Sequence, residues 1–113
     1  MTMTVTRVPS PPVWRNRAAL TLRYARGAHI PRGQVTEVTG ALATVAMQTA
    51  HAVLAARGEW TTNEKRLLRR AGLRGVDTIV AGLRPEPTAL VEAIVETEAL
   101  FRTALADPSF ESA

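Results

Sequence analysis

The sequence of 113 residues contains no cysteine and very little aspartate. Without cysteine there is no disulfide, no thiolate nucleophile and no cysteine-ligated zinc site. This composition is compatible with a reducing compartment, and we predict a cytoplasmic location. Asp77 and Asp107 are the only aspartates, whereas two-metal phosphoryl transfer needs clustered carboxylates. The chain alone is therefore not expected to hold a nucleotidyl-transfer centre, a metal or a cofactor.

Aromatic residues and long apolar runs are also scarce. Two Trp, one Tyr and two Phe leave aliphatic side chains and alanine to form the core, which favours helices over sheets. The longest apolar stretch, 41–56, contains polar residues and is expected to be too short for a membrane span. The start of the chain lacks the apolar run of a signal peptide. A soluble protein without a membrane partner is predicted.

Apolar residues recur every three or four positions, which predicts helices and no strand. The clearest helix is expected over 34–57, and others over 14–26, 61–71, 74–83 and 88–106. A length of 113 residues has room for one domain. The predicted fold is therefore all-α: a single-domain bundle of about five helices with up-down packing.

Some of the side chains can be assigned to the expected core from this spacing. The first helix has apolar character from Leu20, Leu22 and Tyr24. The residues expected to face inward from the later helices are Val35, Val38, Leu42, Val45, Ala46, Thr49, Ala50, Val53, Leu54, Leu67, Leu68, Ala71, Val76, Ile79, Val80, Leu83, Leu90, Val91, Ile94, Val95, Phe101 and Leu105.

The two ends of the chain are predicted to be short tails. Residues 1–13 contain three prolines and little apolar surface, so a flexible tail is expected there. Asp107-Pro108 is expected to stop the last helix. This places the helical bundle at 14–107 and a short tail at 108–113.

Helix boundaries are marked by glycine and by one capping signal. Gly58 and Gly72 are expected to end two helices. Thr61 and Glu64 match a capping box at the start of the helix over 61–71. Trp60 precedes that cap, so it is predicted to be buried against the long and final helices. Small residues beginning at Gly40 suit a close helix neighbour, although glycine there weakens the helix by about 1 kcal/mol.

The formal net charge is +4, and the charges are unevenly distributed. Residues 1–56 carry six Arg and one acid, residues 57–84 carry seven Lys or Arg against three acids, and residues 85–113 carry six acids against Arg102 alone. One interpretation is that the basic middle faces the acidic C-terminal helix, in the same chain or in a copy. The other is a nucleic-acid-binding surface over 57–84. The first is favoured, because nearby acids weaken a positive surface.

The two histidines, His29 and His51, are candidate metal-binding or catalytic residues. His51 has no second histidine or carboxylate three or four residues away, so a structural role is predicted rather than a metal site. Arg23 and His29 show the Arg-x(4–6)-His spacing of ribonucleases of the HEPN class. In such an enzyme Arg binds the scissile phosphate and His acts as general acid or base. A HEPN-like ribonuclease using Arg23 and His29 is the alternative hypothesis from the enzyme class.

The stretch "TAHAVLAARGEWTTNEKRLLRRAGL" (49–73) resembles the helical C-terminal region of actinobacterial nucleotidyltransferase-domain proteins. The likeness extends over 15–106 and is specific mainly across 48–73. It implies a HEPN-like bundle that forms the substrate side of a nucleotidyltransferase. The Gly-Ser turn and the paired aspartates of the catalytic half are missing. The resemblance marks a candidate contact segment of Trp60, Asn63, Lys65 and Arg69, with Lys65 near nucleotide phosphates when a catalytic domain is present.

These observations favour a non-catalytic helical module over an enzyme. Such a module is expected to bind a partner protein, a separate nucleotidyltransferase subunit or another copy of itself. Ribonuclease activity and nucleic-acid binding through 57–84 are the alternatives.

Overall fold

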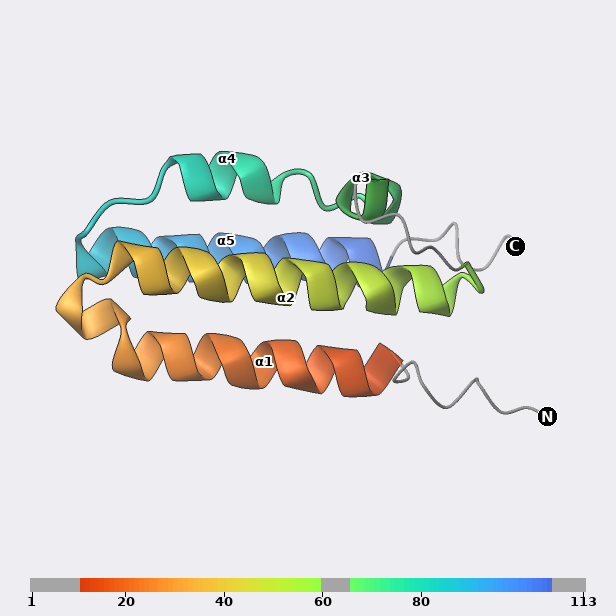
Figure 1. The fold of residues 1–113 in the computed structure, drawn as a ribbon, viewed down its shortest axis with the longest axis horizontal. Helices are drawn as coiled ribbons and strands as arrows, with labels where there is room; N and C mark the ends of the chain where they lie inside the picture. The colour runs from red at the N-terminus through yellow and green to blue at the C-terminus, as the bar shows by residue number, and fades with distance from the viewer. Residues whose placement is uncertain (1–10, 60–65, 107–113) are drawn as a thin grey trace.

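Five helices make up the part of the chain described by the computed structural model, residues 11–59 and 66–106 (Figure 1). They are α1 (Pro11–Ala28), α2 (Val35–Ala56), α3 (Leu67–Ala71), α4 (Val76–Ala81) and α5 (Pro87–Leu105), with the 3-10 turn η2 (Ile30–Arg32) between the first two. No strand occurs in these two ranges. The predicted all-α fold is confirmed.

Apart from the short α3, successive helices along the chain alternate in direction. In Figure 1, α1 and α4 run one way, α2 and α5 run the other way, and α3 is seen end-on. Every other α-helix packs against α2. The predicted up-down packing is therefore confirmed, with α2 as its central element.

Helix α1 begins at Pro11, inside the range 1–13 that was predicted to be a tail. Proline is tolerated in the first helical turn because the amide hydrogen that it lacks has no partner there. Of the three large apolar residues noted in this helix, only Leu22 is buried, whereas Leu20 and Tyr24 are exposed. Over residues 16–28, the part of α1 whose side chains the structure describes, the buried residues are Ala18, Leu22 and Ala25.

Helix α2 matches its predicted stripe closely. All the inward residues expected from Val38 to Leu54 are buried, and only Val35 at the first turn is half-buried. The helix ends at Gly58, which has φ +74°, and the amide of Glu59 donates to the Leu54 carbonyl at 2.8 Å. This is the hydrogen bond of a Schellman motif, so the predicted glycine stop is confirmed.

The 22 residues of α2 also form the one helix of the described ranges that is long and apolar enough to cross a membrane. The sequence-based expectation of too short an apolar stretch counted only 41–56, whereas the helix begins at Val35. Half of its most apolar window is buried by the other helices. Core helices of soluble proteins share these properties, so the cytoplasmic location stays a prediction.

Helices α3 and α4 cover one side of α2. Leu67 and Ala71 are buried as predicted, and Leu68 is half-buried. In α4 only Val76 is buried. The expectation that Ile79, Val80 and Leu83 would be buried is wrong, since all three are half-buried. The six-residue helix α4 and Leu83 just after it contact other helices on one side only. Their larger side chains are therefore not completely enclosed.

Helix α5 buries a narrower face than predicted. Leu90, Ile94 and Phe101 are buried, whereas Val95 is 50% exposed. Successive helical residues are rotated by about 100°, so the neighbour of the buried Ile94 turns away from α2. The remaining core positions are occupied by small or hydroxyl side chains, namely Ala93, Thr97 and Ala104.

Gly40 is exposed in the middle of α2, and a Cβ atom at this position would meet nothing within 4 Å. The expectation of a close helix neighbour is wrong at this position. We therefore expect Gly40→Ala to raise the free energy of unfolding by about 1 kcal/mol, because alanine has the higher helix propensity. Urea unfolding followed by circular dichroism measures this. Ala43→Gly, at another exposed position of α2, should lose a similar amount, and a loss of stability in Gly40→Ala would contradict the reading.

Candidate functional site

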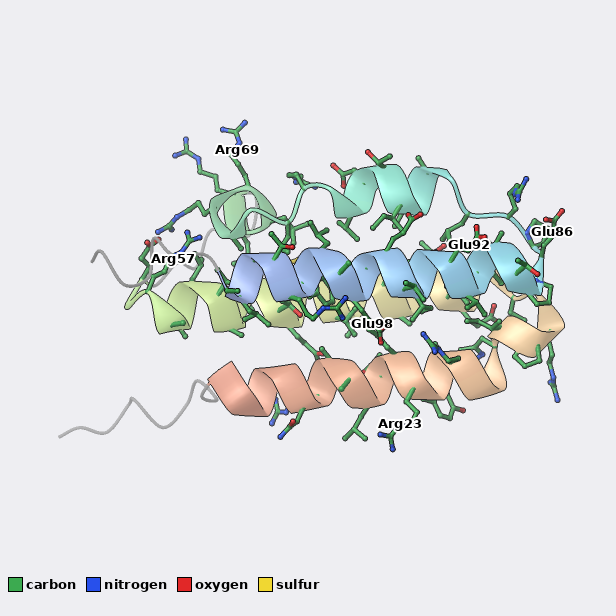
Figure 2. All side chains as sticks on the ribbon, turned by 180° about the vertical axis from the view of Figure 1, so that it is seen from behind. Arg23, Arg57, Arg69, Glu86, Glu92 and Glu98 are labelled. Atoms are coloured by element: carbon green, nitrogen blue, oxygen red, sulfur yellow. The ribbon has the colours of Figure 1, made fainter. Side chains whose placement is uncertain are left out.

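Arg23 and His29, the residues of the ribonuclease hypothesis, differ in exposure and in their contacts. Arg23 is exposed, and in Figure 2 its side chain points away from α2 and α5. His29 is half-buried where α1 turns into η2. Its Nδ1 lies 3.0 Å from Oε1 of Gln34, and its ring meets that of Tyr24 edge to face at 5.4 Å. These contacts give His29 a role in holding the turn between α1 and α2.

Neither residue of that pair lines the groove described below or two further surface cavities of the bundle. General acid–base catalysis needs the proton donor within hydrogen-bond reach of a bound substrate. The structure supplies no shared cavity for Arg23 and His29 among these. The ribonuclease hypothesis stays a prediction without geometric support.

The described residues contain no cluster of side chains that could hold a metal ion. Among residues 11–59 and 66–106, no three His, Cys, Asp or Glu side chains lie close enough together to hold an ion. His51 is half-buried in the middle of α2. The acids of α5 are spread along the helix.

The predicted contact segment falls mostly outside the described residues. Trp60, Asn63 and Lys65 lie in the range 60–65, as do Thr61 and Glu64 of the predicted capping box. Arg69 is described, and it is exposed on α3.

The described residues that flank this range tie α2 to α3. The guanidinium of Arg57 donates to the carbonyl of Arg70 at 2.9 Å, one of the last-turn carbonyls of α3 that have no partner within the helix. The side chain of Arg70 in turn pairs with Glu59 at 2.7 Å. Both partners of this ion pair are more than a third exposed, so it contributes about 1 kcal/mol or less. The described part of the "LAARGEW" stretch therefore has a structural role.

Most arginines of 57–84 are engaged by the protein itself. Besides Arg57 and Arg70, Arg74 pairs with Asp77 at 3.2 Å and Arg84 pairs with Glu86 at 3.4 Å. In the described part of this range, the exposed arginines without an ion pair are Arg66 and Arg69. Affinity for nucleic acid grows with the number of cations that are free to contact phosphates. A nucleic-acid surface over 57–84 is thus poorly supported.

The prediction that the basic residues of 57–84 face the acidic C-terminal helix is also only partly supported. The ion pairs formed by residues 57–84 lie mostly within that range. Glu86, at the start of α5, is the one described partner beyond residue 84. Glu98 of α5 instead lies 3.6 Å from Arg26 of α1. The acids on the outer side of α5 have no such partner within the described ranges.

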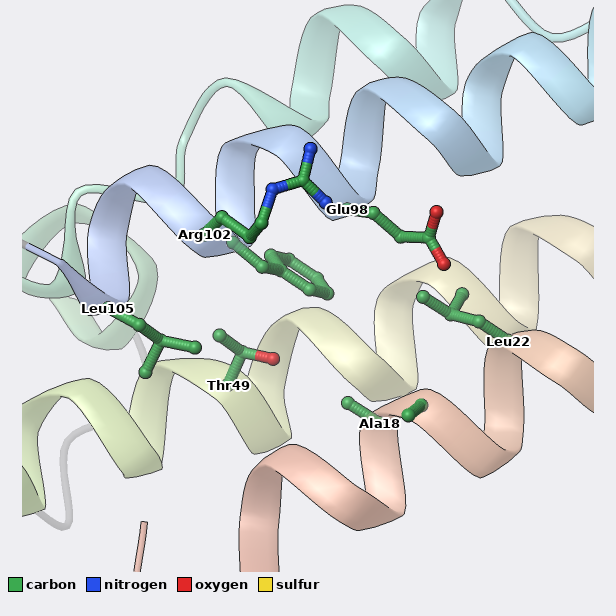
Figure 3. Close-up of a pocket in the computed structure, with 8 residues that line it drawn as sticks. Ala18, Leu22, Thr49, Glu98, Arg102 and Leu105 are labelled. Atoms are coloured by element: carbon green, nitrogen blue, oxygen red, sulfur yellow. The ribbon is translucent and has the colours of Figure 1, made fainter. Parts of the chain in front are cut away.

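A groove lies where α1, α2 and α5 meet (Figure 3). Its volume is about 270 Å³. Its walls are largely apolar: Leu22 comes from α1, Phe101 and Leu105 come from α5, and the small side chains of Ala18 and Ala19 leave the space open. Ala18 and Ala19 of α1 line the groove opposite Phe101 and Leu105 of α5.

Thr49 supplies a polar group to the groove. Its side chain is only 2% exposed, and its hydroxyl points into the groove (Figure 3). The hydroxyls of Thr39 and Thr97 donate to backbone carbonyls four residues earlier, both at 2.8 Å. No described residue forms a hydrogen bond with the Thr49 hydroxyl, which leaves it available to a bound group.

Two charged side chains, Glu98 and Arg102, line the rim of the groove. Glu98 and Arg102 both stand on α5 beside the groove (Figure 3), but Glu98 is compensated by Arg26. Arg102 is exposed and makes no ion pair with any residue that the structure describes. The groove thus combines apolar walls, one hydroxyl and one available guanidinium.

Sequence reasoning had not identified this site. Thr49 was assigned to the core stripe of α2, and Arg102 was noted only as the single cation of an acidic region. A hydroxyl within an apolar stripe and a lone cation among acids were the available signals.

Comparisons with protein-family models, with curated proteins and with solved structures found no match. The resemblance to the helical region of nucleotidyltransferase-domain proteins therefore stays a prediction.

Proposed function

We propose that the protein is a non-catalytic helical module that binds a partner protein in the groove between α1 and α5. The observation that carries this proposal is the buried Thr49 hydroxyl, which points into an apolar groove beside the available guanidinium of Arg102. This hydroxyl forms no hydrogen bond with a described residue, so it can donate one to a group bound in the groove.

The size of the groove favours a protein anchor over a small-molecule substrate. Sites for small molecules usually measure about 300–1,000 Å³, whereas this groove measures about 270 Å³ and is partly open to solvent. That space suits one large apolar side chain. An amphipathic helix that lies in a groove presents such anchors at regular spacing.

The charge of the rim defines the partner further. Because Glu98 is compensated and Arg102 is not, a carboxylate next to the anchoring side chain would gain a charge-assisted hydrogen bond. The proposed occupant is therefore an acidic amphipathic segment of another protein. A separate nucleotidyltransferase subunit is the partner that the sequence resemblance suggests.

Blocking the groove tests this proposal. Ala19 is exposed and lines the groove, so Ala19→Trp should fill it without disturbing the core. The tagged protein, isolated from its native cell, is expected to retain a stoichiometric partner. Ala19→Trp should weaken that partner's binding by about tenfold or more, as loss of an anchor contact does.

Ala43→Trp is the matched control. Ala43 is also exposed, but it lines a different cavity between α2 and the α3–α4 side. It should retain the partner with unchanged affinity. The proposal fails if no partner is retained, if Ala19→Trp binds like the wild type, or if only Ala43→Trp loses binding.

A further inference from the structure

The outer side of α5 carries a second regular stripe, bordered by the cavity beside α4, which Glu92 also lines, and by the groove beside α1, which Arg102 also lines. Its members are separated alternately by four and three residues, which is the spacing of a helix–helix contact seam. All of them are exposed: Thr88, Glu92, Val95, Ala99, Arg102 and Ala106. In Figure 2 no described helix lies in front of α5. We call these six residues the α5 stripe.

The α5 stripe is unlike an ordinary solvated helix face. Its centre is Val95, one of the large hydrophobic side chains exposed on the protein, at 50%. Ala99, next to it on the stripe, is small enough to let another helix approach closely. Its two charged members, Glu92 and Arg102, form no ion pair with any other described residue.

The order of residues along the α5 stripe is self-complementary. When a second copy of α5 is laid antiparallel on the stripe, with the two-fold axis at the level of residue 97 along the helix, Glu92 meets Arg102 of the copy and Val95 meets Ala99. Thr88 meets Ala106 in the same register. Because the arrangement is two-fold symmetric, each contact occurs twice, so that both unpaired charges of each chain receive an opposite partner.

We propose that a second copy of this chain docks antiparallel on the α5 stripe to form a two-fold symmetric dimer. Such an interface uses the same patch on both subunits, as isologous dimers do. The pairing needs the acidic half of the stripe to face the basic half, which only the antiparallel direction provides. A parallel copy would oppose Glu92 to Glu92 and Arg102 to Arg102.

The expected dimer is weak and depends on concentration. A single pair of helices buries less surface than the roughly 1,200–2,000 Å² of stable complexes. Exposed ion pairs are also screened by salt over a distance of about 8–10 Å at ordinary ionic strength. Dimerisation should therefore increase with protein concentration and decrease with added salt.

Charge reversal on the full chain tests the dimer. Sedimentation velocity of the purified protein over a concentration series should show the mass rising from monomer to dimer. Glu92→Arg and Arg102→Glu should each weaken dimerisation by about tenfold or more, because each change places like charges together at two symmetric sites. The double variant Glu92→Arg/Arg102→Glu should restore it. Arg32→Glu, at an exposed position outside the stripe, should have no effect.

A mass that stays monomeric at all concentrations would overturn the dimer, as would a double variant no better than the single ones. All the changed side chains are exposed, and circular dichroism verifies that each variant keeps its helices. The dimer does not rest on the proposed partner protein. The two proposals share Arg102, which also lines the groove. The dimer is measured on the purified chain alone and the groove test uses Ala19→Trp, so the failure of one is distinguishable from the failure of the other.

Discussion

Leu42→Ala should lower the free energy of unfolding by about 3 kcal/mol or more. Leu42 is completely buried in the middle of α2, the helix against which all the others pack. Truncating a buried leucine removes apolar contacts and leaves a cavity, which costs about 2–5 kcal/mol. Small domains have about 5–15 kcal/mol in total, so a large share of the stability is lost. Urea unfolding followed by circular dichroism is the measurement.

Leu20→Ala gives the matched comparison, since the same atoms are removed from a side chain that is 61% exposed. Surface substitutions usually change stability by less than about 0.5 kcal/mol. Similar losses in the two variants would mean that Leu20 is covered in solution or that Leu42 is not in the core.

Gly33→Ala should cost about 2–4 kcal/mol. Gly33 has φ +63°, and a Cβ atom there would lie 2.8 Å from the carbonyl oxygen of Pro85. The left-handed conformation alone costs about 1–2 kcal/mol for a residue with a Cβ atom. The collision adds to this cost because its partner is backbone rather than a flexible side chain.

Gly72→Ala separates the two contributions. Gly72 has a similar φ of +75°, but a Cβ atom there would meet nothing within 4 Å. Its replacement should therefore cost only the conformational part. If both variants unfold at the same denaturant concentration, the close approach of Gly33 to Pro85 does not exist in solution.

This contact also bears on the candidate site. Gly33 belongs to the turn between α1 and α2, and Pro85 lies just before α5. Their approach fixes where α5 starts relative to α1, and the groove is bounded by those two helices. The groove thus depends on a turn that contributes no side chain to it.

The parts of the fold that depend on local patterns were predictable from the sequence. The buried stripe of α2 follows from the spacing of Val38, Leu42 and Val45. Two helices end near Gly58 and Gly72 because glycine readily adopts the positive φ that both positions have. These features need only the helical repeat and the conformational freedom of glycine. They need no knowledge of which helices are neighbours.

The exposure of Val95 and the position of the groove were not predictable in this way. Hydrophobicity alone placed Val95 in the core, whereas its exposure depends on the rotation of α5 against α2. The groove depends on the separation of three helices, and alanines on α1 do not reveal that separation. The contact of Arg57 with the Arg70 carbonyl joins residues 13 positions apart and was missed for the same reason.

The connections around α2 have a consequence for how the chain folds. Helices α1 and α2 are joined by a short turn and share the most extensive packing in the bundle, so their contacts are close in sequence. Closing a short loop costs less entropy than closing a long one, and local contacts speed folding. We therefore expect the α1–α2 hairpin to form first and α5, which reaches α2 only after the α3–α4 segment, to complete the groove in a later step.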